Sequence, residues 1–441
     1  MTSQLKDSPI EVGYNYSLGE LMSEPFKGGQ AATLFPMMTN GLEDRATCIF
    51  FAVLELVYPF RNALLKSIGQ RAYKAGGDFD CTLRPSIGGR LSNKDIPDAL
   101  ISLSQKTDWT ALVEVKIGSG DLDQAQLGRY LNRAISEKVD ALITISNEMC
   151  SDPEHPPLRL KPAEKRLRKI PHFHWSWRYI KFQAGIGLRQ QDLDFVETKI
   201  LEQFIEFLSH EKSGIHGFNQ MPKCWSDFVD VLRDGGRPKS DDTDDVISGW
   251  FQETSDLSLI LSECFDERVS EIHDEKTLEL RKDAAESYLK KTGDLRARFA
   301  LPDGKYLNVL VDINGRCIKF ETAHEPTSKV KTPYKQIERF LDTFRDNETE
   351  DEWGDHSDVR LFAKWSRYRD MTDSSMSEAM IDAKEDTLKD SKIIHPKSDN
   401  LSQIIIQYTP TGAAKNIRSR KKMIEFLETQ TKFFAETYIQ T

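Results

Sequence analysis

Several signatures of familiar protein classes are missing from this chain of 441 residues. Its six cysteines stand singly, with no CxxC pair and no histidine at the spacing of a zinc site, so we expect reduced and mostly buried thiols. No run approaches the roughly eighteen uncharged apolar residues of a membrane-spanning helix, and the first residues lack the apolar stretch of a signal peptide. These absences predict a cytoplasmic protein that contacts no membrane.

Three catalytic or nucleotide-binding motifs are also absent. The chain has no GxxxxGK[ST] segment, no GxGxxG opening a helix and no GxSxG turn. The first two absences leave an NTPase or a dinucleotide-dependent enzyme without its phosphate-binding loop, and the third leaves an α/β-hydrolase without its nucleophile. We therefore expect no nucleotide cofactor.

The net charge of the chain limits how it could bind nucleic acid. The net charge is −10 and the isoelectric point is about 5.6, so the surface as a whole does not attract phosphates. A contact with phosphates must come from a local basic patch, and residues 159–169 hold the best candidate. The alternative is a solvated loop or helix face. The basic residues of this patch are Arg159, Lys161, Lys165, Arg166, Arg168 and Lys169.

The order of predicted elements over the first part of the chain indicates a mixed sheet flanked by helices. An apolar stretch at 42–56 predicts a buried helix capped by Asn40. Asp121 is the predicted cap of a second helix that runs to about residue 137. The predicted strands, of which two form a hairpin, are 79–84, 98–104, 110–117, 141–146 and 170–177.

Two charged residues interrupt the apolar strand 110–117. Glu114 and Lys116 are two residues apart, so a strand points both to one face. A metal site would explain both charges. Mg²⁺ is bound by one or two carboxylates together with waters and phosphates, and a nearby lysine can position an attacking water. The alternative is that Asp98 caps a strand and that Glu114 and Lys116 form an exposed pair of little consequence.

The spacing of these residues resembles a known nuclease signature. Pro97-Asp98 is followed by Glu114-Val115-Lys116, sixteen residues after the aspartate, which is similar to the motif of the PD-(D/E)xK superfamily. Ten residues beyond the lysine, Gln126 and Tyr130 are four apart on the predicted helix and share a face. They resemble the Q-hydrophobic-x-x-Y motif of the RecB-type branch. The resemblance covers about residues 40–180 and implies a restriction-endonuclease-like α/β fold.

The resemblance also implies roles for these residues. Asp98, Glu114 and the main-chain carbonyl of Val115 would hold one or two Mg²⁺ or Mn²⁺ ions, and Lys116 would orient the attacking water and stabilise charge on the phosphate. Gln126 would orient the lysine or contact the phosphate, and Tyr130 would support the backbone contact. Glu43 would be the acid that many members carry on their first helix, where it would face the metal centre as an additional metal-site residue; its other interpretation is a helix-dipole partner.

The implied function is metal-dependent hydrolysis of phosphodiester bonds in DNA, with a restriction or phage-defence role by analogy. The alternative from another class is a catalytically silent module that keeps the nuclease-like fold to bind nucleic acid or to regulate. His172 and His174 share a strand face but have no partner cysteine or HExxH motif, so we interpret both as structural.

The second half of the chain predicts an accessory unit. We expect a nuclease domain over 1–185, a helical connector over 186–245 with an acidic loop at 240–245, and an α+β domain over 246–441. Asp-Gly and Asn-Gly turns predict a meander of strands 297–301, 307–312 and 317–321. The sequence leaves three roles open for this unit: gripping the substrate, joining copies of the chain in a homo-oligomer, and sensing a trigger. The other predicted elements are helices at 192–210, 224–232, 334–344 and 418–438, strands at 360–365 and 403–408, and an acidic loop at 348–358.

Overall fold

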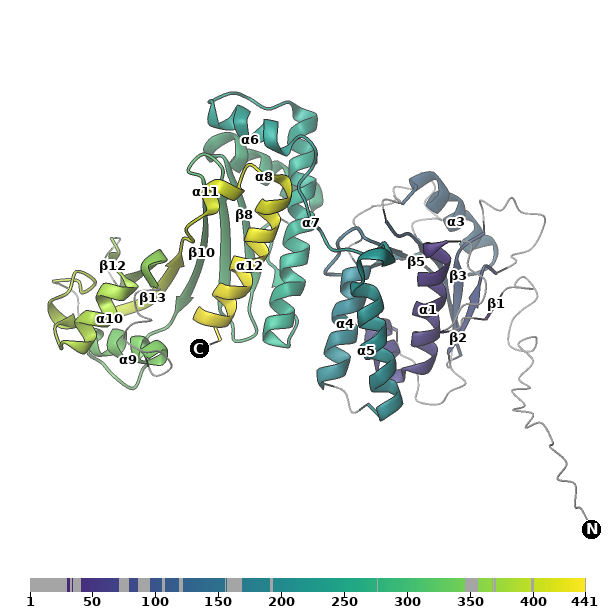
Figure 1. Cartoon of the computed structure of the whole chain (residues 1–441), viewed down its shortest axis with the longest axis horizontal. Coiled ribbons are helices and arrows are strands. Elements are labelled where there is room, and N and C mark those ends of the chain that lie inside the picture. The colour runs from purple at the N-terminus through teal and green to yellow at the C-terminus, as the bar shows by residue number, and fades with distance from the viewer. Residues whose placement is uncertain are drawn as a thin grey trace, which may run out of the picture.

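The described chain is mixed α/β and contains two sheets (Figure 1). Within the described residues, no single helix is long and apolar enough to cross a membrane. The computed structural model describes residues 30–31, 34, 41–70, 79–85, 96–104, 108–118, 122–154, 156, 169–190, 193–275, 277–345, 356–366, 368, 370–397 and 400–440.

The first sheet has six strands in the order β1-β2-β3-β4-β5-β6. Its first four strands pair antiparallel, whereas β5 and β6 join in parallel, so the predicted mixed sheet is confirmed. The predicted hairpin is β3 and β4, which pair from Ala99 with Val113 to Leu103 with Trp109. The strands are β1 (Gln30–Ala31), β2 (Phe79–Leu83), β3 (Ala99–Leu103), β4 (Trp109–Val115), β5 (Ala141–Ser146) and β6 (His172–Ser176).

Helices cover both faces of this sheet, which explains why β4 and β5 read as almost wholly apolar. Val113 and its neighbours on one face pack against α1, α2, α4 and α5, while Leu112 on the other face packs against α3. Glu114 alternates with Val113 and therefore points to the α3 side. The helices are α1 (Leu42–Leu56), α2 (Tyr58–Lys66), α3 (Gln124–Ser136), α4 (Trp177–Gln190) and α5 (Phe195–Ser209).

Two predicted helix caps are wrong. The structure gives the cap of α1 to Gly41 rather than to Asn40. It gives the cap of α3 to Asp123 rather than to Asp121, because the Asp123 carboxylate is the one that accepts the Ala125 amide, at 2.8 Å. Asn40 and Asp121 themselves lie outside the described residues.

The second sheet has seven antiparallel strands in the order β12-β11-β13-β10-β9-β8-β7. Its β8-β9-β10 portion is the predicted meander, and Gly304 in the first turn has a φ of +80°, where glycine is favoured. Apolar residues alternate inward along these strands. The strands are β7 (Ser270–Glu271), β8 (Asp294–Ala300), β9 (Tyr306–Asp312), β10 (Cys317–His324), β11 (Val359–Trp365), β12 (Thr372–Ser375) and β13 (Leu401–Tyr408).

The helices of this second unit correct one prediction. Residues 240–245, predicted to be an acidic loop, form the first turns of α7, because Asp241 and Asp242 suit the positive end of the helix dipole. Three further helices, α8, α10 and the short α11, were not predicted. The acidic loop at 348–358 lies mostly outside the described residues. The helices are α6 (Trp225–Arg233), α7 (Ser240–Phe265), α8 (Leu278–Thr292), α9 (Pro333–Arg345), α10 (Met376–Lys384), α11 (Ala413–Asn416) and α12 (Arg420–Tyr438).

Each sheet has its own hydrophobic core, and α7 reaches both. Leu257 and Leu261 of α7 pack in the core of the second sheet, whereas Leu259 packs in that of the first. Arg178, in the first turn of α4, donates to Asp256 and to Glu263 of α7 at 3.0 and 3.1 Å. Asp256 is almost fully buried, so this ion pair fixes α4 against α7.

Candidate functional site

A cluster of charged side chains lies where β4 ends. Lys116, the first residue after β4, donates through Nζ to Glu114 Oε1 at 2.5 Å and to the Val115 carbonyl at 2.9 Å. Glu43 Oε1 of α1 lies 3.5 Å from the same nitrogen. Asp98, just before β3, accepts the Val115 amide at 2.7 Å. The structure therefore brings together five predicted site residues, Val115 included, from three separate segments.

Helix α3 adds the two remaining residues of the predicted site. Gln126 Nε2 donates to Glu114 Oε1 and to the Tyr130 hydroxyl, both at 2.9 Å. The Tyr130 hydroxyl in turn donates to the Ile96 carbonyl at 3.1 Å. The four-residue spacing places both side chains on the helix face that meets the sheet. Gln126 thus holds the Glu114 carboxylate in position.

Burial makes the electrostatics of this cluster unusual. Burial, together with the charge of Glu114, raises the pKa of Asp98 to about 8, although Lys116 opposes the change. For Lys116, burial favours the neutral amine, but the nearby Glu114 carboxylate outweighs it and the pKa is raised. Burial raises the pKa of Tyr130 as well, so its hydroxyl stays protonated. Among the described residues of the site, three carboxyl groups, those of Glu43, Asp98 and Glu114, lie around one lysine.

One atom of the cluster has no hydrogen-bond partner. Glu114 is only 2% exposed, and its Oε2 accepts no hydrogen bond from any described residue. A buried carboxylate oxygen without a partner costs free energy on the order of 1–3 kcal/mol or more. A cation or an ordered water at this atom would remove that cost.

The described residues contain no group of three His, Cys, Asp or Glu side chains placed to hold a metal ion. The atoms that face the candidate site are two carboxylates, those of Asp98 and Glu114, and the carbonyl of Val115. This set suits Mg²⁺, which commonly takes one or two protein carboxylates and completes its octahedron with waters and substrate phosphates.

The main chain around Lys116 is fixed by contacts that the sequence did not reveal. Trp177 Nε1 donates to the Lys116 carbonyl at 2.9 Å. Asn147 Nδ2 donates to the carbonyls of Gly118 and Gly214, at 3.0 and 2.9 Å. The only sequence clue to Trp177 is a large aromatic residue at a strand-to-helix junction, which usually marks a core position.

Other predicted residues lie elsewhere. His172 and His174 both hydrogen-bond to Thr144 Oγ1, at 3.0 and 2.8 Å, within the first sheet. Burial lowers the pKa of His172 to about 4 and that of His174 to about 3, so both rings are neutral parts of a buried network. In the predicted basic patch only Lys169 is described, and it is exposed. Arg159, Lys161, Lys165, Arg166 and Arg168 lie outside the described residues.

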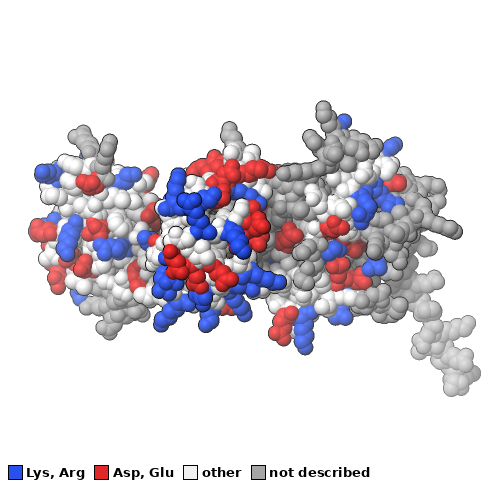
Figure 2. All heavy atoms as spheres, turned by 90° about the horizontal axis from the view of Figure 1, so that it is seen from above, with Lys and Arg blue, Asp and Glu red and all other residues white. Residues whose placement is uncertain are grey.

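Seen from above, the molecule shows basic and acidic side chains interspersed, with no continuous basic surface among the described residues of this face (Figure 2). Comparison of the chain with protein-family models, with curated proteins and with solved structures finds no match. A functional assignment must therefore come from the geometry of the site.

Proposed function

We propose that this chain is a metal-dependent nuclease of the PD-(D/E)xK superfamily, with a restriction-endonuclease-like first domain that hydrolyses phosphodiester bonds in DNA. The observation that carries the proposal is the single hydrogen-bonded cluster formed by Asp98, Glu114, Lys116, Gln126 and Tyr130. These residues come from three segments of the chain, and the contacts among them support the proposal. A role in restriction or phage defence rests on analogy alone.

The chemistry of the donor set fits a hard divalent cation. Among the described residues, Glu114 Oε2 has no hydrogen-bond partner, and burial together with the Glu114 charge raises the pKa of Asp98, so a cation here would stabilise both carboxylates. Asp98, Glu114 and the Val115 carbonyl would hold Mg²⁺ or Mn²⁺. When bound, the ion would lower the pKa of a water molecule and neutralise charge on the phosphate.

The chain's own residues would do the rest. The Lys116 ammonium would orient the attacking water and stabilise the charge that develops on the phosphate. Gln126 would keep Glu114 in its orientation, and the Tyr130 hydroxyl would fix Gln126. Glu43, 3.5 Å from Lys116 Nζ, would steer the ammonium. Trp177 would hold the main chain from which Lys116 projects.

One observation favours a second candidate, a catalytically silent module that binds nucleic acid or regulates. Lys116 Nζ already contacts Glu114 Oε1 and the Val115 carbonyl, two atoms that an ion would need. A lysine that stays there would replace the metal. This candidate predicts DNA binding in the presence of EDTA, measured by fluorescence anisotropy, and no cleavage with either metal.

The nuclease is tested by incubating the full chain with circular and linear DNA, single- and double-stranded, in Mg²⁺ or Mn²⁺. We expect metal-dependent cleavage by the wild type, loss of cleavage in Lys116→Ala, and full cleavage in Lys199→Ala, which removes an exposed lysine of α5. Cutting of the circular substrate would show endonuclease action. Equal cleavage by Lys116→Ala and the wild type would reject the assignment of the site.

A further inference from the structure

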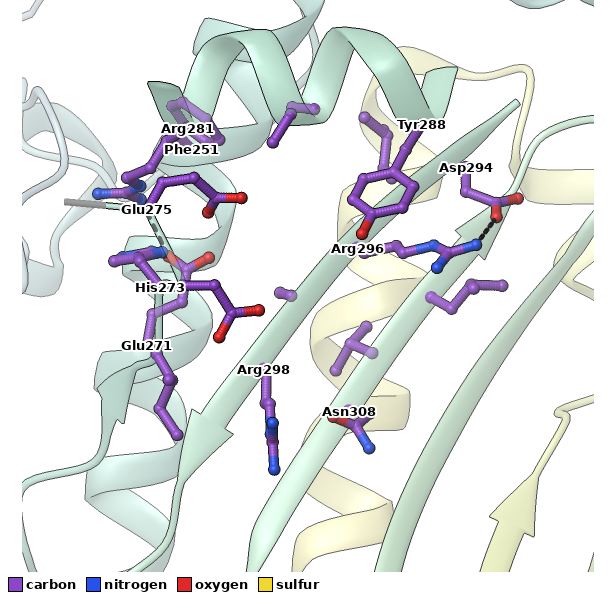
Figure 3. A pocket seen from close by; sticks show the side chains of 18 of the residues that line it. Phe251, Glu271, His273, Glu275, Arg281, Tyr288, Asp294, Arg296, Arg298 and Asn308 are labelled. Atoms are coloured by element: carbon purple, nitrogen blue, oxygen red, sulfur yellow. Dashed lines mark hydrogen bonds and ion pairs between the residues drawn. The ribbon is translucent and has the colours of Figure 1, made fainter. Parts of the chain in front are cut away.

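The second sheet carries a polar pocket of about 370 Å³ that is separate from the candidate nuclease site. Its floor is the outer face of β8, β9 and β10, its wall is α8, and its far end is β7 with the residues that follow (Figure 3). The volume lies in the range of sites for small organic ligands. No step proposed above uses this pocket.

Arginines of this pocket are held on aromatic rings. The Arg281 guanidinium lies 4.9 Å from the ring centre of Phe251, and that of Arg296 lies 4.3 Å from Tyr288. Arg298 lies 4.1 Å from the ring of Tyr306, beside the pocket. Stacking fixes the plane of a guanidinium, so that the N–H groups at its edge can bind a phosphate or carboxylate in a bidentate manner. Arg281 already lies 3.7 Å from the Glu271 carboxylate, which leaves Arg296 and Arg298 as the arginines pre-oriented for an oxyanion of a ligand.

The positions of these cations suit a ligand with phosphate groups. Arg296 and Arg298 alternate along β8 and so project from the same face, roughly 6.6 Å apart along the strand. Arg296 is anchored by Asp294 at 2.5 Å, whereas no described carboxylate lies within ion-pair distance of Arg298. Lys319 on β10 adds a third cation to the floor. Glu321, two residues further along β10, also lines the floor and accepts a hydrogen bond from Asn308 at 3.3 Å, so the carboxylates of Asp294 and Glu321 offset part of this positive charge.

The β7 side of the pocket offers hydrogen-bond acceptors next to Arg298, whose carbonyl accepts the Ile272 amide at 2.7 Å. Figure 3 shows Glu271 and Glu275 across the pocket from Tyr288 and Arg296, with Arg298 and Asn308 along the floor. Glu271 also accepts the Thr254 hydroxyl at 2.7 Å, which fixes its carboxyl group. Carboxylates there would repel a phosphate but accept hydrogen bonds from hydroxyl or amino groups. A nucleotide has both parts: phosphates at one end, and sugar hydroxyls and base amines at the other.

We propose that this pocket binds a nucleotide, with its phosphates on Arg296 and Arg298 and its sugar or base facing Glu271 and Glu275. The nucleotide is either free or part of a nucleic-acid chain, because the recognised chemistry is the same. In this proposal the phosphates are bound by arginine guanidinium groups and not by a glycine-rich phosphate-binding loop. This agrees with the absence of the glycine-rich motifs from the sequence. This proposal is independent of the nuclease proposed above.

The test is calorimetric titration of the full chain in EDTA, which prevents cleavage. The probes are ADP, GDP, CDP and UDP, with inorganic pyrophosphate and a ten-residue oligothymidylate in separate arms. We expect at least one nucleotide probe to bind more tightly than pyrophosphate. Arg298→Ala should weaken that binding about tenfold or more, since a charge-assisted hydrogen bond is worth roughly 1.5–3 kcal/mol. Arg298→Lys keeps the positive charge but cannot bind a phosphate in a bidentate manner. It should therefore bind the nucleotide more weakly than the wild type and more tightly than Arg298→Ala.

The matched control is Arg360→Ala, which removes an exposed arginine of β11 outside the pocket and should bind as the wild type does. Tighter binding of a diphosphate would identify a free nucleotide, and tighter binding of the oligothymidylate would identify a nucleic-acid chain. The proposal is overturned if no nucleotide probe binds, if pyrophosphate binds as tightly as every nucleotide, or if Arg298→Ala and Arg298→Lys bind as the wild type does.

Discussion

The first sheet buries its charged residues at one corner, whereas the second sheet spreads its charged residues over an outer face. Asp98, Glu114 and Lys116 meet in the interior at the end of β4, and Glu114 is nearly inaccessible. Arg298 and Lys319 lie on strands whose outer side is partly open. Burying an ion costs several kcal/mol unless it is compensated, but an exposed charge costs little. Buried charge therefore points directly to a site, whereas surface charge does so only when other groups hold it in place.

Loss of core packing should produce the largest effect on stability in both units. Phe50→Ala in the first core and Phe320→Ala in the second each remove a side chain with no exposed surface. Each should lower the free energy of unfolding by about 3–5 kcal/mol, measured by urea denaturation. If the two cores are energetically separate, Phe320→Ala should leave cleavage at 25 °C unchanged. Loss of cleavage in this variant while its first sheet remains folded would contradict that separation.

The two lysines Lys116 and Lys364 extend the comparison to activity. Lys116→Ala should lower the rate of single-turnover DNA cleavage about 10²–10³-fold, the usual effect of removing one group that stabilises transition-state charge. Lys364→Ala removes an exposed lysine of β11 in the second sheet, outside the pocket, and should leave the rate unchanged. Similar losses in both variants would show that lysine substitution acts through general DNA affinity.

Both units contain a carboxyl group whose pKa burial raises to about 8, namely Asp98 and Glu428. Between the ordinary carboxyl pKa and pH 8 the folded chain keeps these protons and the unfolded chain releases them, so stability falls as pH rises through this window. Asp98→Asn and Glu428→Gln should each flatten this dependence, measured as thermal midpoints without metal. Only Asp98→Asn should also abolish stabilisation by Mn²⁺, and loss of that stabilisation in both variants would contradict the assignment.

The smallest loss of stability is expected on substitution of two tryptophans that each donate a hydrogen bond to a main-chain carbonyl. Trp177 binds the Lys116 carbonyl in the first unit, and Trp225 binds the Ile417 carbonyl in the second at 2.7 Å. Trp177→Phe and Trp225→Phe should each cost about 1 kcal/mol of stability, measured by denaturation. Only Trp177→Phe should also slow cleavage, because it frees the main chain that carries Lys116. An unchanged rate of cleavage in Trp177→Phe would contradict the proposal that Trp177 positions Lys116.

Much of the fold could be predicted because local patterns and tertiary packing agree. The apolar run 141–146 is a buried parallel strand, and the Asp303-Gly304 turn joins β8 to β9. The error at 240–245 arose because an acidic polar run resembles a loop, whereas here Val246 and Trp250 supply the buried face that stabilises the helix. Helix α8 was missed because Leu289 is its one fully buried side chain, so its sequence carries little periodicity.

The candidate site was predictable in part for the same reason. Asp98, Glu114, Lys116, Gln126 and Tyr130 follow a spacing that encodes strand and helix geometry, and the structure brings them together. The contact of Trp177 with Lys116 joins residues 61 positions apart and has no local pattern. The pocket on the second sheet was equally hidden, because its arginines become distinctive only when α8 and the neighbouring strands bring Tyr288 and Tyr306 beside them.

The measurement that tests the central claim most directly is Mn²⁺ binding by the full chain, followed by electron paramagnetic resonance at about pH 8, because burial raises the pKa of Asp98. The buried carboxylates of the first sheet are proposed to hold a divalent cation. The account therefore predicts bound Mn²⁺ in the wild type and its loss in Glu114→Gln, with Glu321→Gln on the second sheet unaffected. Absence of bound Mn²⁺ in the wild type, or equal binding by Glu114→Gln, would contradict it.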